Sequence, residues 1–271
     1  TVPGAADLAA GSRLSLPGLG RFSGLTAADI LPPPDAAADA QRLATRHLVV
    51  VTAADWPAST GQLRCFSREH ETADWYAAGR VVPVMLGRNG LAWGRGLYPP
   101  VPGGRQKTEG DGCAPAGVFA ITALFGVVAD DSPLLAGKQP FLRPTRGLLA
   151  IDDPASIHYN RIVDADQIAA PDWRSAETML RADDRYQLGA VVAHNGPPAV
   201  PGAGSCIFIH VAEAGQPTAG CTALPADEMA RLAGWLATVE APLLVQLPAA
   251  IYDASQAVWG WPALPAPAQG C

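Results

Sequence analysis

The sequence lacks the features that mark several large classes of protein. Only 16% of its 271 residues are charged, the net charge is −6, and it has no run of five basic residues. Nucleic-acid binding therefore has no electrostatic basis in this chain. No uninterrupted apolar stretch reaches the roughly 18 residues of a membrane-spanning helix. Because 49% of the residues are hydrophobic, we expect a globular protein with a well-developed core.

Metal and nucleotide motifs are missing as well. Cys206, His210 and Cys221 lie near one another in the sequence, but neither C-x-x-C nor H-E-x-x-H occurs. We therefore expect no metal site and no cofactor. The glycine-rich stretch 87–96 lacks the Gly-Lys-[Ser/Thr] end of a phosphate-binding loop, so we interpret it as turns between strands.

The five cysteines leave the redox environment open. An odd count fits one working thiol and four cysteines that form two disulfides, which requires an oxidising compartment. Five free thiols in a cytosolic protein is the alternative, and composition does not separate the two.

Hydrophobic patterning predicts many short strands and few helices. The predicted strands are rich in Val, Ile and Phe and are bounded by Gly, Pro, Asn and Asp. They cover residues 48–52, 61–66, 80–86, 117–122, 188–193, 205–211 and 242–247. Helices are predicted at 35–45 with Asp35 as the cap, at 172–183, and at 225–239, where apolar residues recur at helical spacing. The pattern predicts a mainly β sandwich or barrel with helices at its edges.

The stretch 204–224 carries the candidate chemistry. His210 ends a predicted strand and Cys221 follows a loop, so an imidazole can serve as the base that a thiol nucleophile needs. Gly220 allows a sharp turn, and backbone N–H groups around it can face a developing oxyanion. A His and a Cys at this spacing are more often structural than catalytic, so the spacing alone leaves both roles open.

His210 and the turn Thr218-Ala219-Gly220-Cys221 resemble the L,D-transpeptidase (YkuD-like) family. Its members carry a His on one strand and, after a loop, a [Ser/Thr]-His-Gly-Cys turn. The branch with GSxIFLH and PTAGC signatures is the most similar, and the resemblance covers roughly residues 48–247. The supporting segments are 109–112, 115–119, 159–164 and 172–177.

Two positions depart from the family pattern. Ala219 replaces the second His of the turn, so that His has no catalytic part here, and Val211 stands where many members carry Ser or Gly. No side-chain partner for His210 is evident. A backbone carbonyl, that of Val211 itself, is then expected to orient the imidazole.

The resemblance implies a YkuD-like β-sandwich or barrel with a few short peripheral helices and a peptidoglycan L,D-transpeptidase activity. Cys221 would attack a stem peptide at diaminopimelate and His210 would act as base, with the backbone of Ala219 and Gly220 holding the oxyanion. The products would be third-to-third or first-to-third linkages. The alternatives are an L,D-carboxypeptidase or amidase, and a non-catalytic peptidoglycan-binding module.

The resemblance also implies partners and boundaries. Candidate substrate contacts are Tyr159, Asn160, Arg161 and Thr218. Stem peptides are the expected partners, carbapenems the expected inhibitors, and the expected location is periplasmic or secreted with a signal peptide removed. The catalytic domain is expected at 47–248, between an N-terminal arm at 1–46 and a tail at 249–271.

Comparison with the family further suggests a disulfide between Cys113 and Cys206, which leaves Cys65 and Cys271 to pair or stay free. The arm carries the run Pro32-Pro33-Pro34, which favours extended backbone. We predict that the arm folds back and narrows access to the nucleophile, with a flexible linker as the alternative.

Two further polar residues are interpreted without the family. Asp111, between two glycines, is predicted to form a turn and not to line a cleft. His194 precedes Asn195-Gly196-Pro197-Pro198 and is predicted to lie on the surface.

Overall fold

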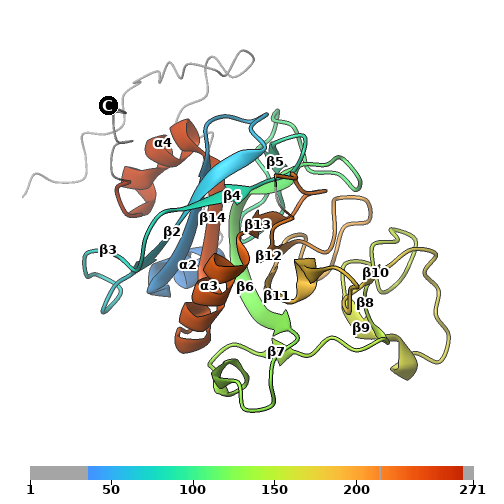
Figure 1. Cartoon of the computed structure of the whole chain (residues 1–271). Helices are drawn as coiled ribbons and strands as arrows, with labels where there is room; N and C mark the ends of the chain where they lie inside the picture. Colours follow the sequence, from blue (N-terminus) through green and yellow to red (C-terminus); the bar gives the residue numbers. More distant parts are fainter. Residues whose placement is uncertain (1–35, 214, 265–271) are drawn as a thin grey trace, which may run out of the picture.

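The chain folds into a closed barrel of short strands. The computed structural model describes residues 36–213 and 215–264. Within this part, the ring order is β1, β14, β6, β11, β12, β13, β4 and β2, and β2 pairs back with β1 to close the sheet (Figure 1). The bounds are β1 His47–Ala53, β2 Thr60–Ser67, β4 Val82–Met85, β6 Ala114–Gly126, β11 Leu188–Val192, β12 Phe208–Val211, β13 Thr222–Leu224 and β14 Leu243–Pro248. The mainly β fold predicted from the sequence is confirmed.

The barrel core is built from the predicted β-branched and aliphatic runs. The four residues Leu48 to Val51 are fully buried, because β1 lies between β14 and β2 and helix α4 (Ala249–Trp259) packs against β1 and β14 from outside. Burial on both faces explains why β1 is uniformly apolar and does not alternate with polar residues.

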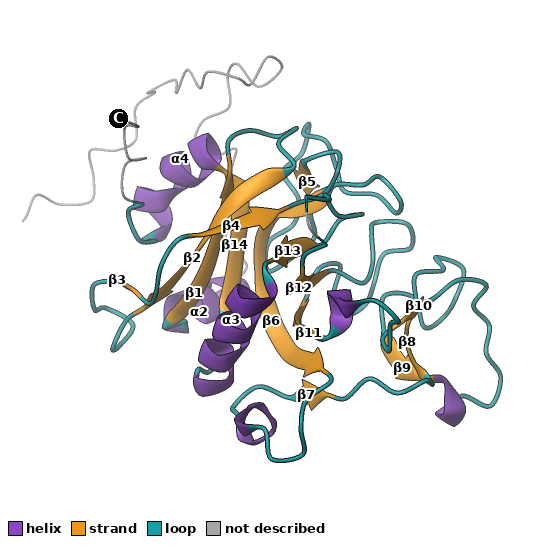
Figure 2. Cartoon of the chain, viewed as in Figure 1, coloured by secondary structure: helices purple, strands orange, loops and turns teal. Residues whose placement is uncertain are grey.

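Two more α-helices lie outside the barrel within the described residues, α2 (Ala36–Ala44) and α3 (Ala226–Thr238) (Figure 2). Helix α3 agrees with the prediction. Met229, Leu232 and Leu236 are buried along one face, and Asp227 and Glu228 occupy the first turn, where carboxylates interact favourably with the helix dipole.

The helix predicted at 172–183 is wrong. Instead, a separate three-stranded sheet forms with β8 in the middle, from β8 Leu148–Ala150, β9 Ile162–Asp164 and β10 Glu177–Thr178. Side chains hold the loop before β10 in place of helical hydrogen bonds. The Asp172 carboxylate accepts from the N–H of Ile157 at 2.8 Å, and that of Asp153 accepts from the N–H of Arg174 at 2.8 Å. Such bonds between separate segments replace the hydrogen bonds that a helix would make.

The strand predicted at 205–211 begins later than expected, at Phe208. Cys206 has a φ of 53°, in the left-handed region, so the chain turns there and is not yet extended. Strand alternation therefore applies only from Phe208 onward.

The remaining short elements are connections and edge pairings. They are β3 Tyr76–Ala77, β5 Leu91–Trp93, β7 Phe141–Leu142 and the 3₁₀ turns η1 Pro133–Ala136, η2 Ala165–Gln167 and η3 Asp184–Tyr186. The stretch between β7 and β11 contains the three-stranded sheet, which stands to one side of the barrel in Figure 1. Its last turn, η3, packs against β12.

No helix in residues 36–213 and 215–264 has both the length and the apolar character needed to cross a membrane.

Candidate active site

The barrel brings His210 and Cys221 to neighbouring strands. β12 and β13 are parallel and pair Ile209 with Thr222 and His210 with Ala223. Cys221 lies directly before β13 and packs against the cluster that contains Phe208 and Tyr186, and the Tyr186 ring also contacts His210. Ile209 points into the barrel core, which places His210 and Cys221 on the outer face.

His210 is buried and held in one orientation. Its Nδ1 lies 2.8 Å from the carbonyl oxygen of Val211, and its ring packs edge-on against the ring of Tyr186 with centroids 5.4 Å apart. A neutral imidazole that donates its Nδ1 hydrogen to this carbonyl keeps Nε2 free to accept a proton. Burial lowers the pKa of His210 to about 4, so the ring is neutral near pH 7.

The Cys221 thiol is likewise packed against buried side chains. Burial, together with the charge of Glu177, raises its pKa to about 12. In the opposite direction, the N–H of Phe208 donates to the sulfur at 3.3 Å, while the thiol donates to the carbonyl of Cys206 at 3.7 Å. The thiol is therefore protonated near pH 7.

The turn before the nucleophile is fixed by Thr218. Its hydroxyl accepts from the N–H of Gly220 at 3.1 Å and donates to the carbonyl of Cys221 at 2.6 Å. The N–H of Gly220, a predicted oxyanion donor, is therefore engaged in this structure. Those of Ala219 and Cys221 have no acceptor among the described residues, which leaves both available to an oxyanion.

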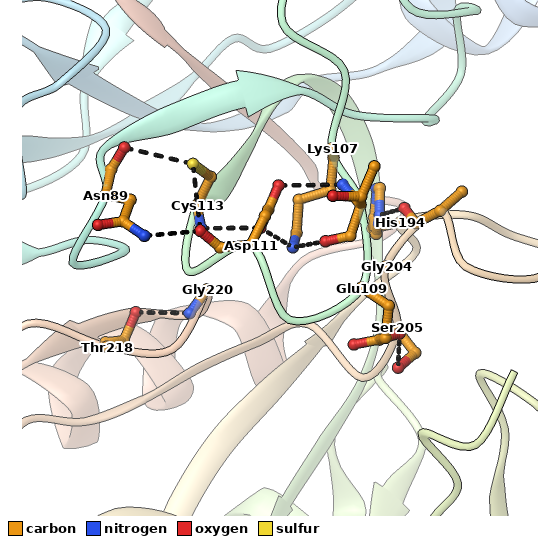
Figure 3. Close-up of polar contacts among 12 residues, drawn as sticks. Asn89, Lys107, Glu109, Asp111, Cys113, His194, Gly204, Ser205, Thr218 and Gly220 are labelled. Atoms are coloured by element: carbon orange, nitrogen blue, oxygen red, sulfur yellow. Dashed lines mark hydrogen bonds and ion pairs between the residues drawn. The ribbon is translucent and has the colours of Figure 1, made fainter.

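The loop 107–113 supports this turn from the other side (Figure 3). The Lys107 ammonium and the Asp111 carboxylate form a buried ion pair with Nζ and Oδ1 2.5 Å apart, and the N–H of Cys113 donates to the same oxygen at 2.9 Å. A Cβ on Gly220 would lie 3.0 Å from the carbonyl oxygen of Cys113, so the two loops touch through backbone. Asp111 thus belongs to a turn, as predicted, and its carboxylate anchors that turn.

The predicted substrate contacts occupy different environments. Tyr159 is buried, and its hydroxyl donates to Glu109 at 2.6 Å. Asn160 has a φ of 61°; its amide donates to the carbonyls of residues 194 and 195, and its oxygen accepts from the N–H of Cys206 at 2.9 Å. Both side chains are thus engaged within the protein. Arg161 is exposed and remains accessible to a ligand.

Two sequence predictions near the site are wrong. Cys113 and Cys206 are both free thiols, because each donates to a different backbone carbonyl: Cys113 to Asn89 at 3.2 Å and Cys206 to that of residue 151 at 3.4 Å. His194 is buried, not on the surface. Its Nε2 lies 3.0 Å from the carbonyl of residue 203, and its Nδ1 accepts a backbone N–H.

Other predictions fall outside this part of the chain. Cys65 is a free, half-buried thiol, while Cys271 lies beyond the described residues. Residues 1–35, with Asp35 and the proline run, also lie outside them, so only residues 36–46 of the predicted arm, with helix α2, are described.

Sequence patterns did not single out three residues that matter to the site, Lys107, Glu177 and Tyr186. Each acts through contacts with segments distant in sequence: Lys107 with the loop under Gly220, and the other two with His210 and Cys221. The spacing of Lys107 four residues before Asp111 was the one local feature visible in the sequence. Within the described residues, no group of three His, Cys, Asp or Glu side chains is arranged to hold a metal ion.

Comparison with known proteins points in one direction. The family model described as the L,D-transpeptidase catalytic domain (YkuD) matches residues 42–245. Among solved structures, L,D-transpeptidase 1 of Mycobacterium tuberculosis matches with 11% sequence identity and a TM-score of 0.29, over 74% of this chain and 62% of that one. The chain thus spans less than two thirds of that protein. No curated protein matches the sequence.

Proposed function

Because the chain belongs to the L,D-transpeptidase catalytic domain family, we propose that it is a peptidoglycan L,D-transpeptidase with Cys221 as nucleophile and His210 as base. The observation that supports the assignment of residues is that Cys221 packs against the cluster that contains Tyr186, and that the His210 ring packs against the same Tyr186 ring. The Val211 carbonyl supports the role of the base, because it fixes the tautomer. We assign the catalytic domain to residues 47–248.

The reaction has two steps. In the first, Nε2 of His210 takes the thiol proton as Cys221 attacks the carbonyl of diaminopimelate in the donor stem, and the same proton then goes to the departing amino acid as a thioester forms. In the second, an amine of the acceptor stem attacks the thioester and transfers its proton to His210, which returns it to the sulfur. The free N–H groups of Ala219 and Cys221 face the oxyanion in both steps.

Exposure to a carbapenem followed by mass spectrometry tests the nucleophile. A carbapenem acylates an activated thiol, so we expect one adduct on the peptide that contains Cys221, none in Cys221→Ala, and at least a hundredfold slower labelling in His210→Ala. Cys65→Ser is a matched control, because burial raises the pKa of that thiol to about 12 as well. Loss of the carbapenem adduct in Cys65→Ser, together with its retention in Cys221→Ala, contradicts the proposal.

Incubation with purified muropeptides tests the acceptor. Cross-linked dimers from the wild type and none from Cys221→Ala support transpeptidation, and sequencing of the dimers distinguishes third-to-third from first-to-third linkage. Shortened stems without dimers indicate an L,D-carboxypeptidase or amidase. No product and no carbapenem adduct indicate a non-catalytic binding module.

A further inference from the structure

Two charged side chains meet on the aromatic ring that covers His210. Tyr186 is buried in η3, with its ring against the imidazole. The Tyr186 hydroxyl donates to Oε2 of Glu177, which lies on β10. The guanidinium carbon of Arg181 lies 5.1 Å from the centre of the same ring. The Glu177 carboxylate and the Arg181 guanidinium therefore both contact Tyr186, whose ring packs against His210.

Glu177 has no ion-pair partner in residues 36–213 and 215–264, and its Oε1 accepts no hydrogen bond. Burial raises the pKa of Glu177 and the charge of Asp152 adds to that effect, while the hydrogen bond from Tyr186 and the charge of Arg181 lower the pKa. Glu177 in turn disfavours ionisation of the Cys221 thiol. A carboxylate that opposes its own nucleophile is useful only if a cation from the substrate offsets it.

Arg181 offers the complementary group. Its Nε and Nη2 bind the two carboxylate oxygens of Asp183 at 2.9 and 2.8 Å, which fixes the plane of the guanidinium. Its Nη1 has no partner in the described part of the chain, and the side chain is 27% exposed. A guanidinium fixed on one edge can bind a second carboxylate with the donors that remain.

We propose that Glu177 and Arg181 recognise the zwitterionic end of a diaminopimelate side chain, Glu177 through its ammonium and Arg181 through its carboxylate. The inference rests on the proposed function and adds the residues that select the substrate. An ammonium on Glu177 offsets the charge that opposes the thiolate, so the correct stem peptide both docks and assists the nucleophile.

The same zwitterion occurs in two substrates. In the donor it lies at the far end of the side chain whose main-chain carbonyl is attacked. In the acceptor its amine is the attacking group. The contact of the carboxylate with Arg181 is common to both substrates, whereas an acceptor amine must be neutral to attack and cannot stay on Glu177 as an ammonium. The two half-reactions separate the sources.

The donor half-reaction is measured as acylation of Cys221 by a stem tetrapeptide, followed by mass spectrometry on the full chain, with active sites counted by carbapenem labelling. Two donors are compared, one with the side-chain amine free and one with it acetylated. We expect the wild type to favour the free amine at least tenfold, as a charge-assisted contact requires. Glu177→Gln should abolish that preference, because the free-amine donor loses its contact while the charge that opposes the thiolate is removed for both donors.

Two variants separate recognition from support of the fold. Tyr186→Phe removes the hydroxyl that binds Glu177 but keeps the carboxylate and the ring on His210. If Glu177 serves only to hold Tyr186, both variants slow both donors equally and the proposal is wrong. Asp184→Asn removes an exposed carboxylate from the same segment and should keep the wild-type preference.

The acceptor half-reaction is measured by trapping the preformed acyl-enzyme with a D-amino acid or with its N-methyl amide, which lacks the carboxylate. A preference for the D-amino acid that Arg181→Gln abolishes assigns the zwitterion to the acceptor. Acylation of Cys221 with no preference for a zwitterion in either half-reaction overturns this inference and leaves the proposed function intact. Absence of any acylation of Cys221 in the wild type overturns both.

Discussion

The buried ion pair between Lys107 and Asp111 gives the most direct test of how the site is supported. The two side chains are 4% and 7% exposed, and Nζ and Oδ1 are 2.5 Å apart. Asp111→Ala leaves the ammonium with only the carbonyl of Thr108 as an acceptor, at 2.9 Å. Loss of one partner of a buried pair costs about 3–5 kcal/mol. We expect Asp111→Ala to lower the free energy of unfolding by that amount.

Lys107→Met is expected to cost less, about 1–3 kcal/mol, because the N–H groups of Thr108 and Cys113 still bind the Asp111 carboxylate at 3.0 and 2.9 Å. In the double variant no charge is stranded. Its loss should fall below the sum of the single losses by about 2 kcal/mol or more. Urea unfolding of the four proteins gives these values. A loss of under about 1 kcal/mol in Asp111→Ala, or strict additivity, refutes the reasoning.

The pair also predicts the response to acid. Burial alone would raise the pKa of Asp111, but the bonds from Lys107, Thr108 and Cys113 lower it below its ordinary 3.8. A carboxyl with a lowered folded-state pKa stabilises the protein above the unfolded-state value, and that stabilisation is lost as pH falls below it. The wild type should therefore lose more stability than Asp111→Ala between about pH 4 and pH 2.

Three further outcomes are expected. Gly220→Ala should slow carbapenem acylation at least about tenfold, because the new Cβ would lie 3.0 Å from the backbone oxygen of Cys113; a wild-type rate contradicts the contact. Asn160→Ala should lower the free energy of unfolding by about 2–4 kcal/mol in urea titration, because two carbonyls and the N–H of Cys206 lose their partners. Acylation should be limited by protonation of His210 only below about pH 4, so a decline near pH 6.5 contradicts a buried neutral base.

The barrel strands were predictable where the local pattern is strong. β1 contains the apolar run 48–51, β14 is apolar except for the buried Gln246, and α3 repeats apolar residues at helical spacing, so the local pattern was enough to predict each element. The predicted helix at 172–183 failed because Asp172 and Asp153 bind backbone N–H groups of other segments. Competition from distant partners leaves no trace in local periodicity.

The residues of the candidate site also fall into those that local sequence predicts and those that depend on distant contacts. His210 and the turn at Cys221 were found because they form a contiguous motif with a family resemblance. His194 was misplaced because a Gly-Pro-Pro stretch suggests exposure, whereas the fold packs the ring against Phe119 and onto a backbone carbonyl. The roles of Glu177 and Tyr186 depend on η3 packing against β12, which only the three-dimensional structure reveals.

The groups around the sulfur indicate how the resting site stays unreactive. Burial and Glu177 raise the pKa of the Cys221 thiol, while the N–H of Phe208 and the more distant charge of Lys107 lower it. The raising effects prevail, since the pKa reaches about 12. A small neutral alkylating reagent supplies no cation to Glu177 and encounters a protonated thiol. Under the recognition proposed above, a zwitterionic stem peptide neutralises Glu177 and removes one of the two opposing effects at the moment of binding. The proposal therefore couples reactivity in this site to the charge of the substrate.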